Sequence, residues 1–178
     1  AIGGNVDGVS TLQMAGAFAS FGNKGYYNKP STIVKVFNAN GKELVNIKSE
    51  PVKAMSEETA YLMTSVLKGV LTDNGTSPNG KIPNFDMAGK SGSSTFDDSA
   101  YYNYGIDVTN STKDSWMIGY TTDYTVAVWQ GADVVDSAAK ALSYNQAKTT
   151  QVIMANVLKK ASDNKVPAAF EKPAGRKK

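Results

Sequence analysis

Apolar residues recur at helical spacing in three stretches of this chain. The first follows Ser10, which pairs with Gln13 in the pattern of a capping box. The second follows Ser56, and two glutamates in its first turn complement the helix dipole. The third, a long amphipathic stretch, opens at Ser143. The pattern predicts helices over 10–22, from 56 to about 74, and from 143 onward, the second burying Leu62, Met63, Val66, Leu67, Val70 and Leu71 and the third running through Val152, Ile153, Ala155, Val157 and Leu158.

Runs of β-branched and aromatic residues predict two β-hairpins. Residues 31–37 and 42–47 flank Asn40-Gly41, a dipeptide typical of tight hairpin turns. Residues 115–120 and 124–129 form the second pair of strands. Each strand of this second pair carries a tryptophan, and we expect these two rings to be cross-strand core partners rather than a ligand-stacking pair.

Two segments between the hairpins fit neither pattern. Residues 87–94, Met-Ala-Gly-Lys-Ser-Gly-Ser-Ser, are too few for a helix and too rich in glycine for an ordinary interior strand. We therefore expect another group to approach this backbone closely. The polar, tyrosine-rich stretch from Thr95 to Lys113 lacks periodicity and predicts a long excursion between two strands.

Composition narrows the possible chemistry. The 178 residues include no cysteine and no histidine, which excludes disulfides, thiolate nucleophiles, Cys/His zinc sites and histidine-based triads. A hydrophobic content of 41% is that of an ordinary globular domain. The net charge of +3 comes from the basic residues of 171–178, so the rest of the chain is neutral and a nucleic-acid partner is not expected.

The chain carries no recognisable targeting or membrane segment. No stretch approaches the roughly 18 apolar residues that a membrane span needs. Because the sequence begins Ala1-Ile2-Gly3-Gly4 and leads directly into helical pattern, we expect a processed or cut fragment of a longer protein. The basic residues near the end, within 163–178, predict a flexible tail.

Lys90-Ser91-Gly92-Ser93 is the segment most suggestive of chemistry. Lys90 supplies a fixed positive charge and Ser91 a hydroxyl donor for the same anion, such as a peptide carboxylate. Gly92 leaves room for an extended substrate along the strand edge, and the Ser93 N–H can stabilise an oxyanion. Taken alone, the triplet is weak evidence for a binding site, because an isolated Lys-Ser-Gly is far more often a solvated strand end or a β-bulge at Gly92.

The order of several segments gives this triplet its context. These segments are 8–15 (Gly-Val-Ser-Thr-Leu-Gln-Met-Ala), 60–67, 87–94, 113–121 and 124–131. Together they resemble the transpeptidase domain of class A, bifunctional penicillin-binding proteins, which share their fold with serine β-lactamases and use Ser-x-x-Lys, Ser-x-Asn and Lys-[Ser/Thr]-Gly motifs. The resemblance covers most of residues 1–160.

The resemblance implies an α/β (α+β) sandwich of the serine β-lactamase/D,D-peptidase type, an antiparallel sheet flanked by helices, with the N-terminal part of the domain missing from this chain. Residues 1–162 then form the C-terminal part of the transpeptidase domain. The implied function is peptidoglycan cross-linking through an acyl-enzyme, with acylation by β-lactams. No cofactor or metal is implied, and the implied location is the outer face of the bacterial plasma membrane, with an N-terminal anchor outside this chain.

Motif matching assigns roles within 90–94. Lys90 and Ser91 are expected to hold the terminal carboxylate of a stem peptide that ends in D-Ala-D-Ala, and Lys90 to lower the pKa of the serine-lysine pair. Gly92 is expected to admit the substrate strand, and the Ser93 N–H to form half of the oxyanion hole, with Ser94 continuing the binding strand. The expected partners are this peptide, β-lactams, and an upstream segment that carries the nucleophilic serine.

Short matches to the family's other motifs also occur within the chain. The most tempting set combines Ser65/Lys68 and Ser77/Asn79 with the Lys90 triplet, but Asn79 lies too close to Lys90 in sequence for this family. Ser162-Asp163-Asn164 comes after the Lys90 strand and fits a helix stop better. We assign catalysis to none of them, nor to the remaining matches at Ser137/Lys140, Ser143/Asn145 and Ser162/Lys165.

Other functions remain open at this point. A D,D-carboxypeptidase or β-lactamase of the same fold differs in using water instead of an acceptor amine. A non-catalytic cell-surface binding module on a transpeptidase-like scaffold is the alternative from another class. Segment 95–113 is expected to border the cleft and to shape access for the acceptor.

Overall fold

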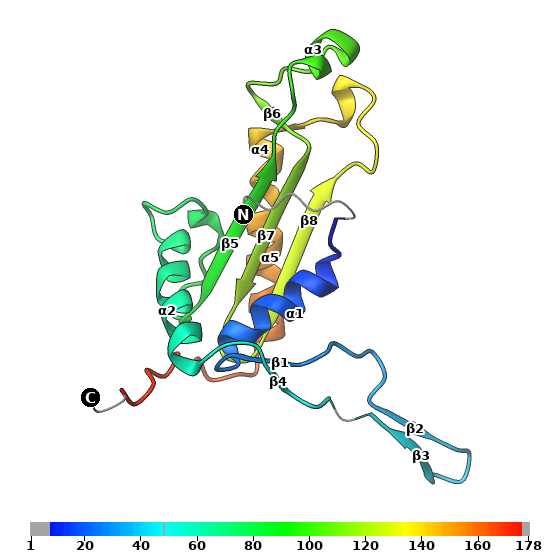
Figure 1. Ribbon diagram of the computed structural model, residues 1–178, viewed down its shortest axis with the longest axis vertical. Coiled ribbons are helices and arrows are strands. Elements are labelled where there is room, and N and C mark those ends of the chain that lie inside the picture. Colours follow the sequence, from blue (N-terminus) through cyan, green and yellow to red (C-terminus); the bar gives the residue numbers. More distant parts are fainter. Residues whose placement is uncertain (1–7, 48, 176–178) are drawn as a thin grey trace.

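A three-stranded antiparallel sheet forms the centre of the computed structural model, which describes residues 8–47 and 49–175. Its strands are β5 (Ala88–Ser94), β7 (Asp114–Tyr120) and β8 (Thr125–Gly131), in the order β5-β7-β8 (Figure 1). β7 and β8 are joined by a short turn, as the sequence predicts. The segment predicted to be unsuited to a sheet interior becomes β5, a strand at the edge of this sheet.

Helices cover both faces of the sheet (Figure 1). α1 (Thr11–Gly22) and α2 (Glu57–Lys68) contact one face, and α5 (Thr149–Ala161) contacts the other. α1 begins where the sequence predicts, because Ser10 and Gln13 exchange both bonds of a capping box. Ser56 likewise caps α2 by accepting from the Thr59 N–H at 3.1 Å.

The alternation of side chains along the strands divides the core into two clusters. Met117 of β7 points to α5 and packs there with Met154 and Leu158, all of them fully buried. Tyr120 of β7 points to the opposite face, against Leu67 of α2 and the aromatic rings of α1. At 0% exposure, Tyr120 is the largest fully buried side chain among the described residues.

The helical stretch after Ser56 buries Leu67 and Leu71 as predicted, but the rest of its buried face differs from the prediction. Leu62 and Val66 are 64% and 70% exposed, and the buried row is Ala60, Thr64 and Leu67. Small side chains suit this row because α2 lies against both α1 and the edge strand β5. Thr64 also hydrogen-bonds the Tyr120 hydroxyl at 3.0 Å, which satisfies two polar groups inside the core.

The helix predicted from Ser143 is divided at Lys148. A capping box between Ser143 and Gln146 starts the single-turn helix α4 (Tyr144–Ala147), and α5 follows. In α5 the buried positions are Thr150, Gln151, Met154 and Leu158, whereas Val152, Ile153 and Val157 are 42–48% exposed. Met154 contacts β7 so closely that a Cβ at Gly119 would lie 2.2 Å from its sulfur.

The predicted first hairpin is confirmed and projects away from the sheet as β2 (Lys35–Phe37) and β3 (Glu43–Asn46) (Figure 1). Segment 95–113 connects β5 to β7 as expected, and it also contains one short helix, α3 (Ser99–Tyr104). The remaining elements are short: β1 (Tyr26–Tyr27), β4 (Val52–Lys53), η1 (Gly69–Leu71), η2 (Pro78–Gly80), β6 (Ser111–Thr112), η3 (Ala138–Lys140) and β9 (Leu142–Ser143).

The chain after α5 returns to the end of the sheet where β7 ends at Tyr120 (Figure 1). There Phe170 packs against the ring of Tyr120, with ring centroids 5.7 Å apart, and its N–H donates to Asp86 at 2.9 Å. Glu171 pairs with Lys24 near the end of α1. Residues 176–178 of the predicted tail, and Ala1-Ile2-Gly3-Gly4 of the predicted cut start, lie outside the described residues.

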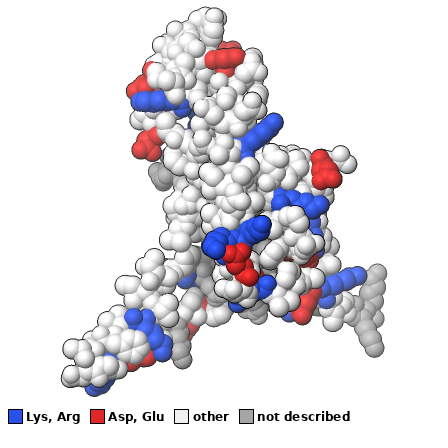
Figure 2. All heavy atoms as spheres, turned by 180° about the vertical axis from the view of Figure 1, so that it is seen from behind, with Lys and Arg blue, Asp and Glu red and all other residues white. Residues whose placement is uncertain are grey.

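Charged side chains are scattered over the face shown in Figure 2, with basic and acidic groups interspersed among uncharged ones. Within the part of the chain that the structure describes, no helix has both the length and the apolar character that a bilayer crossing requires.

Candidate active site

A groove of about 830 Å³ lies on the α1 side of the sheet, alongside the C-terminal half of β5. All five residues that the sequence singles out, Lys90 to Ser94, line it. Residues of α1, β7 and β8 also line the groove. The other lining residues are Gly8, Val9, Ser10, Thr11, Met14, Phe18, Asp114, Trp116, Ile118, Trp129 and Asp133.

β5 is an edge strand, since only β7 pairs with it among the described residues. An edge strand leaves alternate backbone N–H and C=O groups free to bond an extended ligand. Lys90 is exposed, and its ammonium donates to the Ser91 carbonyl at 2.6 Å. The positive charge therefore lies directly along the backbone of the predicted binding strand.

The Ser91 hydroxyl has a neighbour that sequence reasoning missed. Thr76, in the loop between η1 and η2, places its hydroxyl oxygen 3.3 Å from that of Ser91. The two residues are 15 positions apart, so no local sequence pattern indicates this contact. The local pattern at Asn74-Gly75-Thr76 is instead that of a glycosylation sequon.

The tryptophan pair is cross-strand, as predicted, but the expectation that it belongs to the core is wrong. Trp116 and Trp129 are direct partners on β7 and β8, with ring centroids 6.5 Å apart. Both line the groove, and Trp129 is 37% exposed. They share the sheet face with Tyr120, which α1 and α2 cover, but they lie farther along the strands, where the groove begins.

Asp114 connects neighbouring strands at one end of the groove. The sequence analysis did not identify this residue. One carboxylate oxygen accepts from the Trp129 indole N–H at 2.8 Å, and the other accepts a short hydrogen bond from the Ser94 hydroxyl. The Asp114 side chain thus connects β5 to β8 across β7. Gly131 makes this possible, because a Cβ there would lie 2.6 Å from the Trp129 ring and 3.0 Å from the carboxylate.

The charges of the groove are separated along its length. Lys90 is the one cationic side chain among its lining residues, and Asp114 and Asp133 supply the negative charge. Because the remaining lining residues are uncharged, an anionic group is best accommodated beside Lys90. No cluster of three or more acidic, cysteine or histidine side chains suited to a metal occurs in 8–47 and 49–175.

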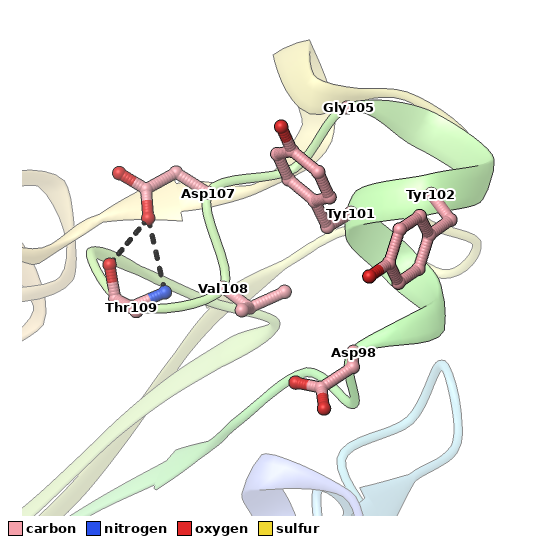
Figure 3. Close-up of a pocket in the computed structure, with 7 residues that line it drawn as sticks. All are labelled: Asp98, Tyr101, Tyr102, Gly105, Asp107, Val108 and Thr109. Atoms are coloured by element: carbon pink, nitrogen blue, oxygen red, sulfur yellow. Dashed lines mark hydrogen bonds between the residues drawn. The ribbon is translucent and has the colours of Figure 1, made fainter.

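A second cavity, of about 500 Å³, lies within the excursion between β5 and β7 (Figure 3). Tyr101 and Tyr102 of α3 contribute exposed rings 5.5 Å apart, and Asp98 lies below them. Asp107 on the facing loop accepts hydrogen bonds from Asn110 and Thr109, which lower the pKa of its carboxyl to about 2. This carboxylate is therefore ionised at every physiological pH.

The internal matches to the serine motifs do not gather in the groove. The Ser65 hydroxyl donates to the Tyr61 carbonyl within α2, and Lys68 is paired with Asp86 at 2.7 Å. Ser77 is completely buried, and Asn79 lies in η2. None of these four residues lines the groove.

Comparison with known proteins decides the family. Residues 1–159 match the family model of the penicillin-binding protein transpeptidase domain. The chain belongs to this family. This confirms the resemblance to class A penicillin-binding proteins, and the mixed, antiparallel architecture confirms the expected fold class.

Relatives of this transpeptidase domain include penicillin-binding protein 1A/1B of Bacillus subtilis, 38% identical over 171 residues, which are 96% of this chain and 18% of the relative. Penicillin-binding protein 1A of Streptococcus oralis is 37% identical over 124 residues, 70% of this chain and 19% of the relative. The chain therefore spans about a fifth of the length of these relatives.

Solved transpeptidase domains have the same fold. The penicillin-binding protein PonA1 of Mycobacterium tuberculosis matches 93% of this chain with 41% of its own, at a TM-score of 0.71 and 25% identity. The D,D-transpeptidase domain of a peptidoglycan glycosyltransferase from Eggerthella lenta matches 84% of this chain with 32% of its own, at a TM-score of 0.58 and 25% identity.

Proposed function

We propose that this chain supplies the substrate-binding strand of a serine D,D-transpeptidase that cross-links the stem peptides of peptidoglycan, and that β-lactams acylate the same enzyme. One observation carries the proposal. The Lys90–Ser94 segment forms an edge strand beside a groove large enough for an extended peptide. The family membership of the chain supports the same chemistry.

In the proposal, Lys90 and Ser91 bind the terminal carboxylate of a peptide that ends in D-Ala-D-Ala. Lys90 has a flexible stem, so its ammonium can turn from the Ser91 carbonyl to the incoming anion. The Ser91 hydroxyl donates a second, charge-assisted hydrogen bond to that anion. Both residues line the groove.

The surroundings of Gly92 support this placement of the substrate. A Cβ at Gly92 would meet only the Cβ of Trp116, at 3.4 Å, which is an ordinary contact. Packing within the chain therefore does not need a glycine here. We propose that the missing side chain leaves room for the substrate backbone, and that the N–H of Ser93 donates to the oxyanion that forms at the scissile carbonyl.

The proposed reaction needs a nucleophile from another part of the protein. A serine on a preceding segment attacks the penultimate D-Ala carbonyl, forming an ester as the peptide C–N bond breaks and D-Ala leaves with a proton. An amine of a neighbouring stem peptide then attacks the ester, and the serine hydroxyl is regenerated. Lys90 favours loss of the serine proton by lowering, through its charge, the pKa of the serine-lysine pair.

The proposal also includes the domain boundaries of the chain and the cellular location of the complete enzyme. Residues 1–162 form the C-terminal part of the transpeptidase domain, and 163–178 form a tail. The segment 95–113 stands beyond the groove and carries the second cavity, and in the proposal it shapes the approach of the acceptor (Figure 3). We place the complete enzyme at the outer face of the plasma membrane, held by an N-terminal anchor.

Labelling with a fluorescent penicillin tests the proposal. We expect this chain alone to remain unlabelled, and a protein that also contains the preceding segment to be labelled on a serine of that segment. Ser65→Ala is the matched control and is expected to label normally, because the Ser65 hydroxyl is bonded within α2. Stoichiometric labelling of this chain alone at Ser65 would overturn the proposal.

A reaction with a stem-peptide donor and an amine acceptor then separates the related activities. A cross-linked product supports the transpeptidase. Release of D-Ala without transfer identifies a carboxypeptidase. Neither product, together with no labelling, indicates a non-catalytic binding module.

A further inference from the structure

The hydroxyl of Thr76 lies 3.3 Å from the hydroxyl of Ser91, although the two residues belong to different segments. We infer that Thr76 is a positioning residue, which directs the Ser91 hydroxyl toward the substrate carboxylate. The inference rests on the proposed function, in which Ser91 binds this carboxylate. It adds a residue that lies outside the Lys-Ser-Gly triplet and does not line the groove.

The loop around Thr76 is held in place on both sides. A Cβ at Gly75 would lie 2.3 Å from the Val70 carbonyl oxygen, so only a glycine allows the chain to pass this close to η1. The Ser77 N–H donates to the same Val70 carbonyl at 2.9 Å, and Ser77 is completely buried. Thr76 is exposed between these two anchored residues, and its position relative to β5 is therefore determined by packing.

Ser91 needs such a partner because its own hydroxyl is free to rotate. Its backbone is set by the pairing of β5 with β7, in which Ser91 lies opposite Met117, but the O–H bond turns about the Cβ–Oγ axis. The nearby Lys90 ammonium bonds the Ser91 carbonyl and not the hydroxyl. Within residues 8–47 and 49–175, Thr76 is the hydrogen-bond partner of this hydroxyl.

A bound carboxylate determines which hydroxyl donates in the hydrogen bond between Thr76 and Ser91. An ionised carboxylate only accepts hydrogen bonds, so Ser91 must donate its one proton to it. The Ser91 oxygen is then left to accept from Thr76, and each bond in this chain polarises the next. Without an anion either hydroxyl can donate, and the 3.3 Å separation is longer than the usual O–H···O distance.

Acylation of the complete transpeptidase domain by a penicillin provides the test. We expect Thr76→Val to lower the second-order acylation rate constant about 2- to 10-fold, the range of one neutral hydrogen bond. Thr76→Ser keeps the hydroxyl and should retain most of the rate. Thr72→Val is the matched control, since the Thr72 hydroxyl in the same loop donates to the Gly69 carbonyl, away from the groove.

Two further measurements separate positioning from a structural role. In a Ser91→Ala background, Thr76→Val is expected to cause no additional loss. With a penicillin whose carboxylate is esterified, Thr76→Val and the unsubstituted domain are expected to react at the same rate. An equal loss on both penicillins, or an additional loss in the Ser91→Ala background, would overturn the inference.

The outcome also distinguishes this inference from the proposed function. If the unsubstituted domain is not acylated by the penicillin, the proposed function itself fails. If the domain is acylated and Thr76→Val reacts like Thr72→Val, the function stands and the positioning role of Thr76 is wrong.

Discussion

The indole N–H of Trp129 on β8 donates to the carboxylate of Asp114 on the neighbouring strand β7 at 2.8 Å, and both residues line the groove. The other oxygen of the same carboxylate accepts from Ser94 of the edge strand. A single side chain of β7 therefore links the proposed substrate-binding strand to the exposed tryptophan of β8. The geometry of the groove depends on this carboxylate as much as on the strand that carries the Lys-Ser-Gly triplet.

Asp114→Ala should loosen this end of the groove. Two hydrogen bonds to an ionised group are lost, and because the site is partly exposed we expect a decrease of about 1 to 3 kcal/mol in the free energy of unfolding of the complete domain. Denaturant titration followed by tryptophan fluorescence measures it. Asp114→Asn retains an acceptor for Trp129 and is expected to lose less. Equal stability of all three proteins would contradict the role of Asp114.

Gly92→Ala should separate folding from substrate binding. The new methyl group would meet Trp116 at an ordinary distance, so the melting temperature of the complete domain should stay nearly unchanged. The same methyl group would occupy the space proposed for the substrate backbone, and we expect the penicillin acylation rate to fall at least about 10-fold, as for a loss of 1.4 kcal/mol in transition-state binding.

Gly119→Ala is the contrasting variant, because its methyl group would lie 2.2 Å from the Met154 sulfur on the α5 side of the sheet. It is expected to lower the melting temperature. A Gly92→Ala protein that acylates normally would remove Gly92 from the binding strand.

Because of Tyr120, the free energy of unfolding of the domain should decrease in the alkaline pH range. Burial raises the pKa of the Tyr120 hydroxyl to about 12, against the lowering effect of its hydrogen bond with Thr64. The unfolded chain ionises near pH 10, so the stabilisation is complete below pH 10 and is lost as the pH rises toward 12. The loss amounts to about 2 to 3 kcal/mol.

Denaturant unfolding of the complete domain at a series of pH values from 9 to 12 checks this prediction. Tyr120→Phe lacks the titrating hydroxyl, and the stability of that variant should fall less steeply over the same range. Parallel pH profiles for the two proteins would show that Tyr120 does not cause the loss.

The excursion between β5 and β7 should affect acceptor use more than acylation. Replacing residues 97–110 with a short Gly/Ser linker removes α3 and the cavity of Figure 3 but keeps the hydrogen bonds of Thr112 and Lys113 to the Ser94 carbonyl. We expect cross-linking in a donor–acceptor assay to slow more than penicillin acylation. Equal losses in both reactions would instead assign the excursion a role in folding.

Local sequence patterns predicted much of the backbone. The starts of α1 and α2 follow from Ser10 and Ser56, because a side chain that caps a helix bonds an amide only three residues away. The β2–β3 hairpin follows from its Asn-Gly turn for the same reason of short range. The family, too, was recognisable from the order of short segments.

The sequence was less informative about which side of an element is buried. Leu62 and Val66 of α2 are mostly exposed, whereas Ala60 and Thr64 are buried, because proximity to α1 and β5 favours small side chains. Apolar character at helical spacing predicts that one face is buried, but neighbours elsewhere in the chain select the face. For the same reason Trp116 and Trp129 pair across the strands as expected and yet line the groove.

By itself, then, the sequence determined the chemistry that is available: a lysine, hydroxyls and a glycine on one strand, in a chain without histidine or cysteine. Only the tertiary structure decided which distant groups meet this strand. Thr76 reaches Ser91 because Gly75 and Ser77 anchor its loop to η1. Such contacts depend on packing between segments that are far apart in sequence, and local periodicity does not predict that packing.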